Sequence, residues 1–175
     1  LANHIYQQYE GVVEGGGAVD GPELERLLTS LVADRQALLA TVQDADEQDL
    51  QQSTRNPGWT VQHVLAHVLA ADADLIAILE AASRAGTHTH VPSTGEHERE
   101  MATWMTATLR AISSELGNRS ERWEQLTIAL GETSFAATVG GRKSTVGDLI
   151  ADWQGHDVQH KEDVQLAVSA GSSHC

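Results

Sequence analysis

Four stretches of this chain repeat apolar residues at the spacing of one helical face, and this pattern limits the fold more than any other feature. The residues recur at i, i+3, i+4 and i+7, which predicts amphipathic helices rather than strands. We expect the helices over about residues 21–43, 61–83, 101–116 and 146–167. The positions that carry the pattern are Leu24, Leu27, Leu28, Leu31, Val32, Leu38, Leu39 and Val42; Val61, Val64, Leu65, Val68, Leu69, Leu75, Ile76 and Leu79; Met101, Trp104, Met105, Leu109, Ile112 and Leu116; and Val146, Leu149, Ile150, Trp153, Val164 and Ala167.

Turn-forming residues divide the chain between these helices. Gly117 and Asn118 form a suitable stop for the third helix, and a short helix is expected around Trp123. Residues 86–95 read as a loop, and residues 135–145 read as a small hairpin or an irregular crossover. Four helices with long connections after the second and the third predict an all-α four-helix bundle. The glycine-interrupted residues 1–20 are expected to form an arm or tail, residues 21–170 the bundle, and residues 171–175 a C-terminal tail.

The charge balance excludes several classes of partner. The chain has 175 residues, with 11 basic and 25 acidic side chains and a formal net charge of −14. This balance supplies no basic surface for nucleic acid. No segment is apolar for long enough to span a bilayer, and the first nine residues lack a signal-peptide pattern, so a cytoplasmic protein is expected. Because Cys175 is the single cysteine, any metal would be held by histidines and carboxylates.

Three histidines fall where two neighbouring helices could meet. Counted at about 100° per residue from Val146, His156 and His160 lie near 280° and 320°, on the buried stripe of the last helix. Two imidazoles at i, i+4 can chelate one ion. Counted from Val61, His67 lies near about 240°, on the flank of the second helix, where it could complete a three-histidine set. The alternative is one hydrogen-bonded core histidine and one at the solvent edge. His63 reads as a surface residue, or as half of a separate chelate with His67.

Two motifs resemble a known family. The segment Trp59-Thr60-Val61-Gln62-His63-Val64-Leu65-Ala66-His67-Val68-Leu69-Ala70-Ala71-Asp72 and the helix of residues 145–166 with His156-Asp157-Val158-Gln159-His160 are similar to the DinB-like superfamily. The Pro57-Gly58-Trp59-Thr60 entry is especially similar to its mycothiol-dependent maleylpyruvate isomerase branch. The resemblance covers about residues 21–170. It implies an up-down-down-up bundle, frequent dimers, a divalent metal on His67, His156 and His160, and transfer or isomerisation with a low-molecular-weight thiol.

The resemblance and the site chemistry together suggest a function. Three neutral imidazoles leave a coordination position open on a divalent ion, with Zn or Ni expected here, and an open position is typical of catalytic sites. A thiol bound there becomes a metal-bound thiolate, whereas a bound water is acidified and favours hydrolysis. We expect a thiol-dependent S-transferase that uses mycothiol or bacillithiol on an electrophilic small molecule, and a homodimer. The alternatives are a metal-dependent hydrolase and a non-catalytic dimeric bundle with a structural metal.

Charged residues on three apolar stripes indicate a buried polar cluster. Arg35, Asp72 and Asp157 each fall near about 20° on their helices, facing inward. Because a lone buried charge is strongly disfavoured, Arg35 is expected to contact Asp72 or Asp157, with one carboxylate near a ligand imidazole. Helix curvature that turns these groups to solvent is the alternative. His97 is a candidate outer-shell donor or a partly exposed residue at a helix start, and Trp153 is a core aromatic or a wall of the pocket.

Overall fold

The computed structural model describes residues 21–85, 88–89, 93–129, 138–139 and 145–172. The helices are α2 (Gly21–Asp44), α3 (Val61–Ala85), α4 (Thr94–Trp104), α5 (Leu109–Ala129) and α7 (Val146–Ser172), with a short 3-10 helix η2 (Asp49–Gln51). Two short strands, β1 (His88–Thr89) and β2 (Thr138–Val139), complete the described elements. None of the described helices is both long and apolar enough to cross a membrane.

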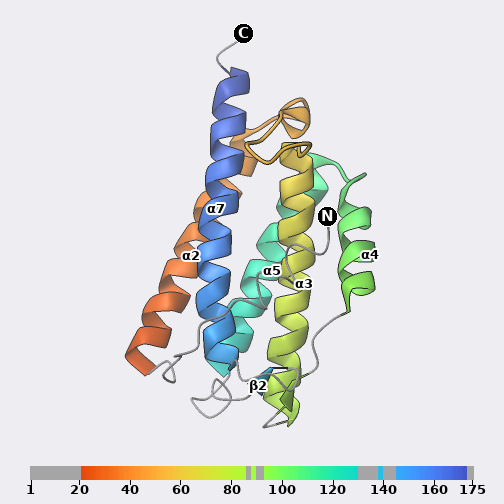
Figure 1. The fold of residues 1–175 in the computed structure, drawn as a ribbon. Helices are drawn as coiled ribbons and strands as arrows, with labels where there is room; N and C mark the ends of the chain where they lie inside the picture. Colours follow the sequence, from red (N-terminus) through yellow and green to blue (C-terminus); the bar gives the residue numbers. More distant parts are fainter. Residues whose placement is uncertain (1–20, 86–87, 90–92, 130–137, 140–144, 173–175) are drawn as a thin grey trace.

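The long helices α2, α3, α5 and α7 form an up-down-down-up four-helix bundle, as Figure 1 shows. α7 packs between α2 and α3, α5 packs against α2 and α3, and α4 lies on the outer side of α3. The predicted fold class and its topology are therefore confirmed. The helix boundaries of α2 and α3 follow the apolar pattern to within two residues, and α7 extends to Ser172, into the predicted tail.

The third predicted helix is wrong in its boundaries, since the chain here forms two helices. α4 ends at Trp104 and α5 begins at Leu109, because side chains from elsewhere satisfy the backbone at the break. Gln62 Nε2 donates to the carbonyls of Trp104 and Ala107, at 3.3 and 3.0 Å, and Glu47 Oε1 accepts from Leu109 N.

The predicted stop at Gly117 and Asn118 is also wrong, because α5 continues through both residues. A Cβ at Gly117 would lie 4.0 Å from Leu39 Cδ2, so this glycine lies where α5 comes close to α2. The short helix expected around Trp123 is instead the second half of α5.

The connection before α7 pairs with a distant segment. Thr138–Val139 forms parallel pairs with His88–Thr89, which follows α3. The described strand thus pairs with the segment that follows α3. Residues 140–144 of the predicted hairpin lie outside the described residues. The arm predicted over residues 1–20 also lies outside them.

The loop between η2 and α3 is held against α7. Arg55 Nε donates to Asp163 Oδ1 at 2.7 Å, and Asn56 Nδ2 donates to Asp163 Oδ2 at 2.9 Å. An antiparallel bridge joins Ser53 to Thr60 and closes the loop. Asp163 itself is buried, one turn after His160. This connection therefore lies over the same turn of α7 that carries a candidate ligand.

Candidate metal centre

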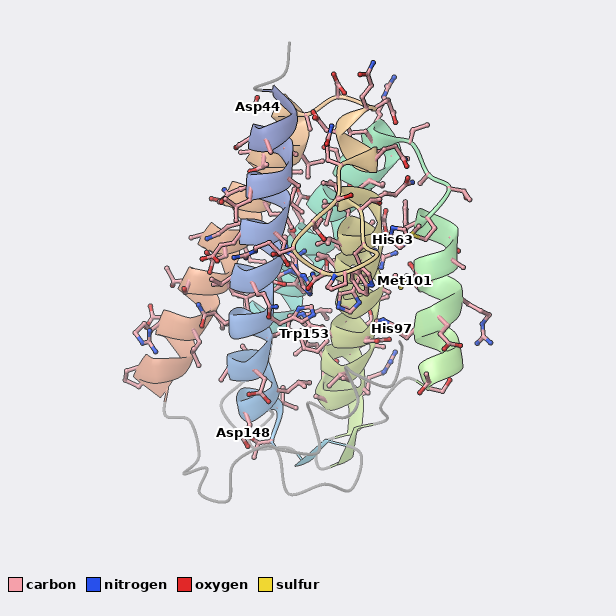
Figure 2. All side chains as sticks on the ribbon, turned by 45° about the horizontal axis from the view of Figure 1, so that its top comes forward. Asp44, His63, His97, Met101, Asp148 and Trp153 are labelled. Carbon is pink, nitrogen blue, oxygen red and sulfur yellow. The ribbon has the colours of Figure 1, made fainter. Side chains whose placement is uncertain are left out.

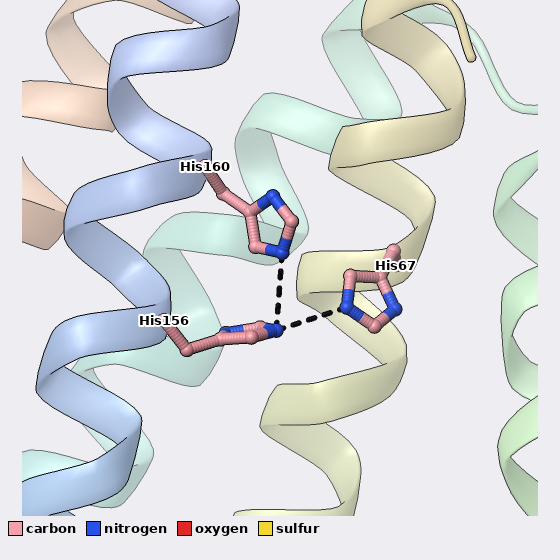
Figure 3. Close-up of side chains that lie close together, drawn as sticks. All are labelled: His67, His156 and His160. Carbon is pink, nitrogen blue, oxygen red and sulfur yellow. Dashed lines mark hydrogen bonds between the residues drawn. The ribbon is translucent and has the colours of Figure 1, made fainter. Parts of the chain in front are cut away.

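Three imidazoles from two helices converge in the middle of the bundle, as the close-up in Figure 3 shows. α3 supplies His67, and α7 supplies His156 and His160 from successive turns. His156 Nε2 lies 2.9 Å from His67 Nε2 and 3.1 Å from His160 Nε2. The three candidate ligand nitrogens lie within 4.8 Å of one another. The structure thus brings together the three histidines that the sequence singled out.

The environment of these rings favours the neutral form. His67 and His160 are buried, while the side chain of His156 is 17% exposed. Burial, with His156 and His160 acting in the same direction, holds the pKa of His67 well below its usual 6.5. Burial and His156 likewise lower the pKa of His160 to about 3. Both side chains therefore present lone pairs, the form that binds metal ions.

The cluster cannot satisfy its own nitrogens by hydrogen bonding. A ring nitrogen carries either one hydrogen or one lone pair, so His156 Nε2 makes one good hydrogen bond and not two. The Nδ1 atoms of all three rings are buried and have no hydrogen-bond partner in the described part of the chain. One divalent cation among the Nε2 atoms would engage all three lone pairs. The donor set therefore fits such an ion.

In the part of the chain that the structure describes, no fourth ligand completes the set. Within the described residues, no Cys, Asp, Glu or further His side chain joins the three histidines in one ligand group. Three neutral imidazoles around zinc leave a coordination position for a small molecule. Nitrogen ligands suit both zinc and nickel. A metal ion held by these three histidines would therefore keep a coordination position free for a reactant, as catalytic sites require.

His63 takes no part in the cluster. Its Nδ1 lies 2.9 Å from Thr60 Oγ1, at the start of α3, and the side chain is half-buried. Because His67 Nε2 faces His156, the structure favours the three-histidine cluster over the separate His63–His67 chelate considered above, and His63 is half-buried rather than a surface residue.

Aromatic side chains flank the cluster. Trp59 meets His67 edge-on with ring centroids 5.4 Å apart, and Trp153 lies 5.9 Å from His156. Trp153 is thus beside the candidate ligand, where a pocket wall was expected. The loop held by Asp163 carries Trp59, whose position beside His67 the sequence analysis did not anticipate. His156 remains the most exposed ring of the three.

His97 is buried and lies against His67 from the side of α4. The two rings are T-shaped with centroids 5.5 Å apart, and His97 is 4% exposed. Its Nδ1 lies 2.7 Å from Asp74 Oδ2, on α3. Figure 2 shows His97 between α3 and α4. Asp74 was missed, although the count that puts His67 near about 240° puts Asp74 near about 220°, on the same flank.

A shared ion pair connects three helices beside the cluster. Arg35 Nη2 lies 2.7 Å from Asp72 Oδ1 and 2.7 Å from Asp157 Oδ2, and all three residues are buried. The sequence predicted contact with one of the two aspartates, and the structure shows both. The alternative in which these groups turn to solvent is wrong, because the apolar stripes of α2, α3 and α7 all face this point.

The environments of the two aspartates shift their pKa values in opposite directions. Burial, together with Asp157, raises the pKa of Asp72 to about 7 against the effect of Arg35. Burial also acts to raise the pKa of Asp157, but Arg35 and His156 outweigh it and hold that pKa below its usual value. Asp157 Oδ1 lies 3.8 Å from His156 Nδ1, near the imidazole but beyond hydrogen-bonding distance.

A separate cavity of about 170 Å³ lies between α2 and α5. Arg35 and Trp123 are among the residues that line it, and none of the three clustered histidines does. This cavity therefore reaches Arg35 of the ion pair but does not include the histidine cluster.

The fold and the cluster together define a DinB-like four-helix bundle with a candidate metal centre. The chain belongs to the family described as the mycothiol maleylpyruvate isomerase N-terminal domain, whose model matches residues 31–164. No curated protein matches the chain.

Two solved structures share the fold. YfiT from Bacillus subtilis, described as a probable metal-dependent hydrolase with an unusual four-helix bundle topology, is 16% identical with a TM-score of 0.75. The match covers 93% of this chain and 95% of YfiT. The mycothiol-dependent maleylpyruvate isomerase is 18% identical with a TM-score of 0.69, and the match covers 81% of this chain. This chain spans about 60% of the length of that isomerase.

Replacing Arg35 with Met should destabilise the fold strongly. The change leaves Asp157 as a buried carboxylate without its counter-charge, and breaking a buried pair costs about 3–5 kcal/mol. Urea unfolding of the metal-free protein measures this loss. Arg84→Met is the matched control, because the Arg84 side chain is 72% exposed and its ion-pair partner lies at 3.9 Å. Equal unfolding midpoints for the two variants would contradict the described role of Arg35.

The raised pKa of Asp72 predicts a pH-dependent contribution to stability. A carboxyl group that is protonated in the folded chain and ionised in the unfolded chain loses stability as pH rises from its usual pKa to its folded pKa. The stability of the natural protein relative to Asp72→Asn should therefore fall between about pH 4 and pH 7 and then level off. Urea unfolding at a series of pH values measures the difference. A difference that is constant or rises over this range would show that Asp72 is ionised throughout.

Proposed function

We propose that this protein is a metal-dependent enzyme that transfers a low-molecular-weight thiol to an electrophilic small molecule. The observation that carries the proposal is the group of three convergent imidazoles, which no fourth ligand joins among the described residues. Family membership supports the thiol, because the matching model is named for a mycothiol-dependent enzyme. Mycothiol is the first thiol to test, and bacillithiol is the second.

His67, His156 and His160 would hold the ion, with Zn or Ni as the expected metals. When bound, a divalent cation lowers the pKa of a coordinated thiol, so that the thiol reacts as a thiolate near neutral pH. The buried rings of His67 and His160 contribute neutral nitrogens without a competing proton. The chain thus supplies a ligand set that is ready for an ion at physiological pH.

The residues around the cluster would position the reactants. His156 is the most exposed ligand candidate, so reactants would reach the site along its edge. Trp153 and Trp59 lie on either side and provide apolar surfaces that exclude water and hold an electrophile. Arg35 ties the turn of α7 that carries His156 to α2 and α3 through Asp157 and Asp72. The geometry assigns no general acid or base.

Two other functions compete with this proposal. Hydrolysis is favoured by the likeness to YfiT, which is described as a probable metal-dependent hydrolase. A structural metal that only joins α3 to α7 is the non-catalytic alternative. The described residues supply no fourth ligand, which argues against it. The homodimer and the cytoplasmic location expected from the sequence stay predictions.

Replacing either His156 or His160 with Ala should abolish stoichiometric metal binding. Each change leaves two imidazoles, which are too few for a tight site in this set. Elemental analysis after loading with zinc or nickel measures the ion content. His63→Ala is the matched control and should retain one ion, because His63 lies one turn before His67 but outside the cluster. One tightly held ion in both alanine variants would show that the site lies elsewhere.

The metal-loaded protein should conjugate a thiol to a chromogenic electrophile. Turnover with mycothiol or bacillithiol is expected, and both the metal-stripped protein and His156→Ala should be inactive. Loss of the electrophile without any added thiol would instead support the hydrolase. If every thiol tested leaves the loaded protein inert and does not shift its melting temperature, the structural metal becomes the better account.

A further inference from the structure

His67 has a ring nitrogen that the three-histidine cluster does not use. Its Nε2 faces His156, whereas Nδ1 is buried and has no hydrogen-bond partner in the described part of the chain. In Figure 3 this second nitrogen faces away from α7, toward the side of the bundle where α4 lies. When Nε2 binds an ion, Nδ1 carries the hydrogen of the neutral ring. A buried N–H of this kind needs an acceptor.

His97 has the complementary atom. Its Nδ1 is 2.7 Å from Asp74 Oδ2, and an ionised carboxylate only accepts, so Nδ1 carries the hydrogen. In the neutral ring the Nε2 atom of His97 is then a bare lone pair. This atom is also buried and also lacks a hydrogen-bond partner among the described residues. One orphaned donor and one orphaned acceptor thus belong to neighbouring rings.

The rings of His67 and His97 lie in contact with each other. Their centroids are 5.5 Å apart at an interplanar angle of 66°. The other aromatic neighbour of His67 outside the cluster is Trp59, whose indole nitrogen is a donor only. No carboxylate in the described structure lies within ion-pair distance of His67. The structure does not bond His67 Nδ1 to His97 Nε2. The proposed arrangement therefore requires a small change in the terminal torsion of one ring, a torsion that is broad in histidine.

We propose that Asp74 and His97 form an outer hydrogen-bond chain that ends on Nδ1 of His67 and positions this ligand for the metal. The inference rests on the proposed metal binding by His67. His97 is a positioning residue in this arrangement, since it acts through His67. The hydrogen-bond chain makes α4 part of the metal centre, although none of the three ligands lies on α4. Such outer partners fix the ring orientation and typically contribute about 10–100-fold in metal affinity.

Paired variants at His97 and Asp74 test the hydrogen-bond chain. His97→Phe and Asp74→Leu remove the acceptors, and each should weaken zinc binding by about 10–100-fold. His97→Gln and Asp74→Asn each keep a carbonyl oxygen that can accept, so both should bind zinc within a few-fold of the natural protein. Glu98→Gln, at the exposed residue next to His97, is the control and should change nothing. Competition with a chromophoric chelator measures the affinity, and melting temperatures of the metal-free variants separate weak binding from poor folding.

Nitrogen-15 NMR of the imidazoles gives a readout that needs no variant and no activity. In the metal-free protein His97 should carry its hydrogen on Nδ1 and none on Nε2. In the zinc-loaded protein the Nδ1–H of His67 should exchange slowly with water, and His97→Phe should abolish this protection.

The hydrogen-bond chain and the proposed function can fail separately. A hydrogen on His97 Nε2, or His97→Phe with unchanged zinc affinity, would overturn the chain while leaving the three ligands intact. If the natural protein bound no zinc, both the proposed metal centre and the hydrogen-bond chain would be overturned.

Discussion

The ion pair of Arg35 with Asp72 and Asp157 is the constraint on which the rest of the structure depends. Three ionisable groups lie in the centre of an apolar bundle, and the burial of each depends on its contact with the others. The guanidinium comes from α2 and the carboxylates from α3 and α7, so the pair fixes how these helices are placed along one another. Asp157 directly follows His156. The contacts of Arg35 therefore also fix the position along the bundle axis at which α7 places its two imidazoles beside His67.

The comparisons and the site support different parts of the functional argument. Identities of 16% and 18% to the solved structures establish the fold and no chemistry. The family model adds that this fold is the N-terminal domain type associated with mycothiol. What the chain itself adds is a set of three histidines that no fourth ligand joins among the described residues, flanked by Trp59 and Trp153. The proposal of a thiol transferase depends on that combination rather than on any one source.

Helical periodicity predicted the bundle, the three histidines and the contact of Arg35, because each depends on which way a side chain faces from a regular helix. It failed where the deciding partner comes from elsewhere in the chain. The break between α4 and α5 depends on Gln62 and Glu47, which lie about 40 to 60 residues earlier and cap the exposed backbone. The pairing of β2 with β1, and of Asp74 with His97, likewise requires knowing how the connections and α4 are placed in space. The local sequence pattern does not specify where a distant segment lies in space.

The one-sided exposure of the histidine cluster has a kinetic consequence. His67 and His160 are buried and His156 is the most exposed ring of the three, so both reactants of the proposed enzyme would have to approach along His156. The molecule that must reach the nitrogens has to enter first, and the second then covers it from the solvent side. Product must leave along the same edge before the next cycle begins. A transferase built on this site would follow a compulsory order of addition, and an excess of the second reactant would inhibit by occupying the entrance too early.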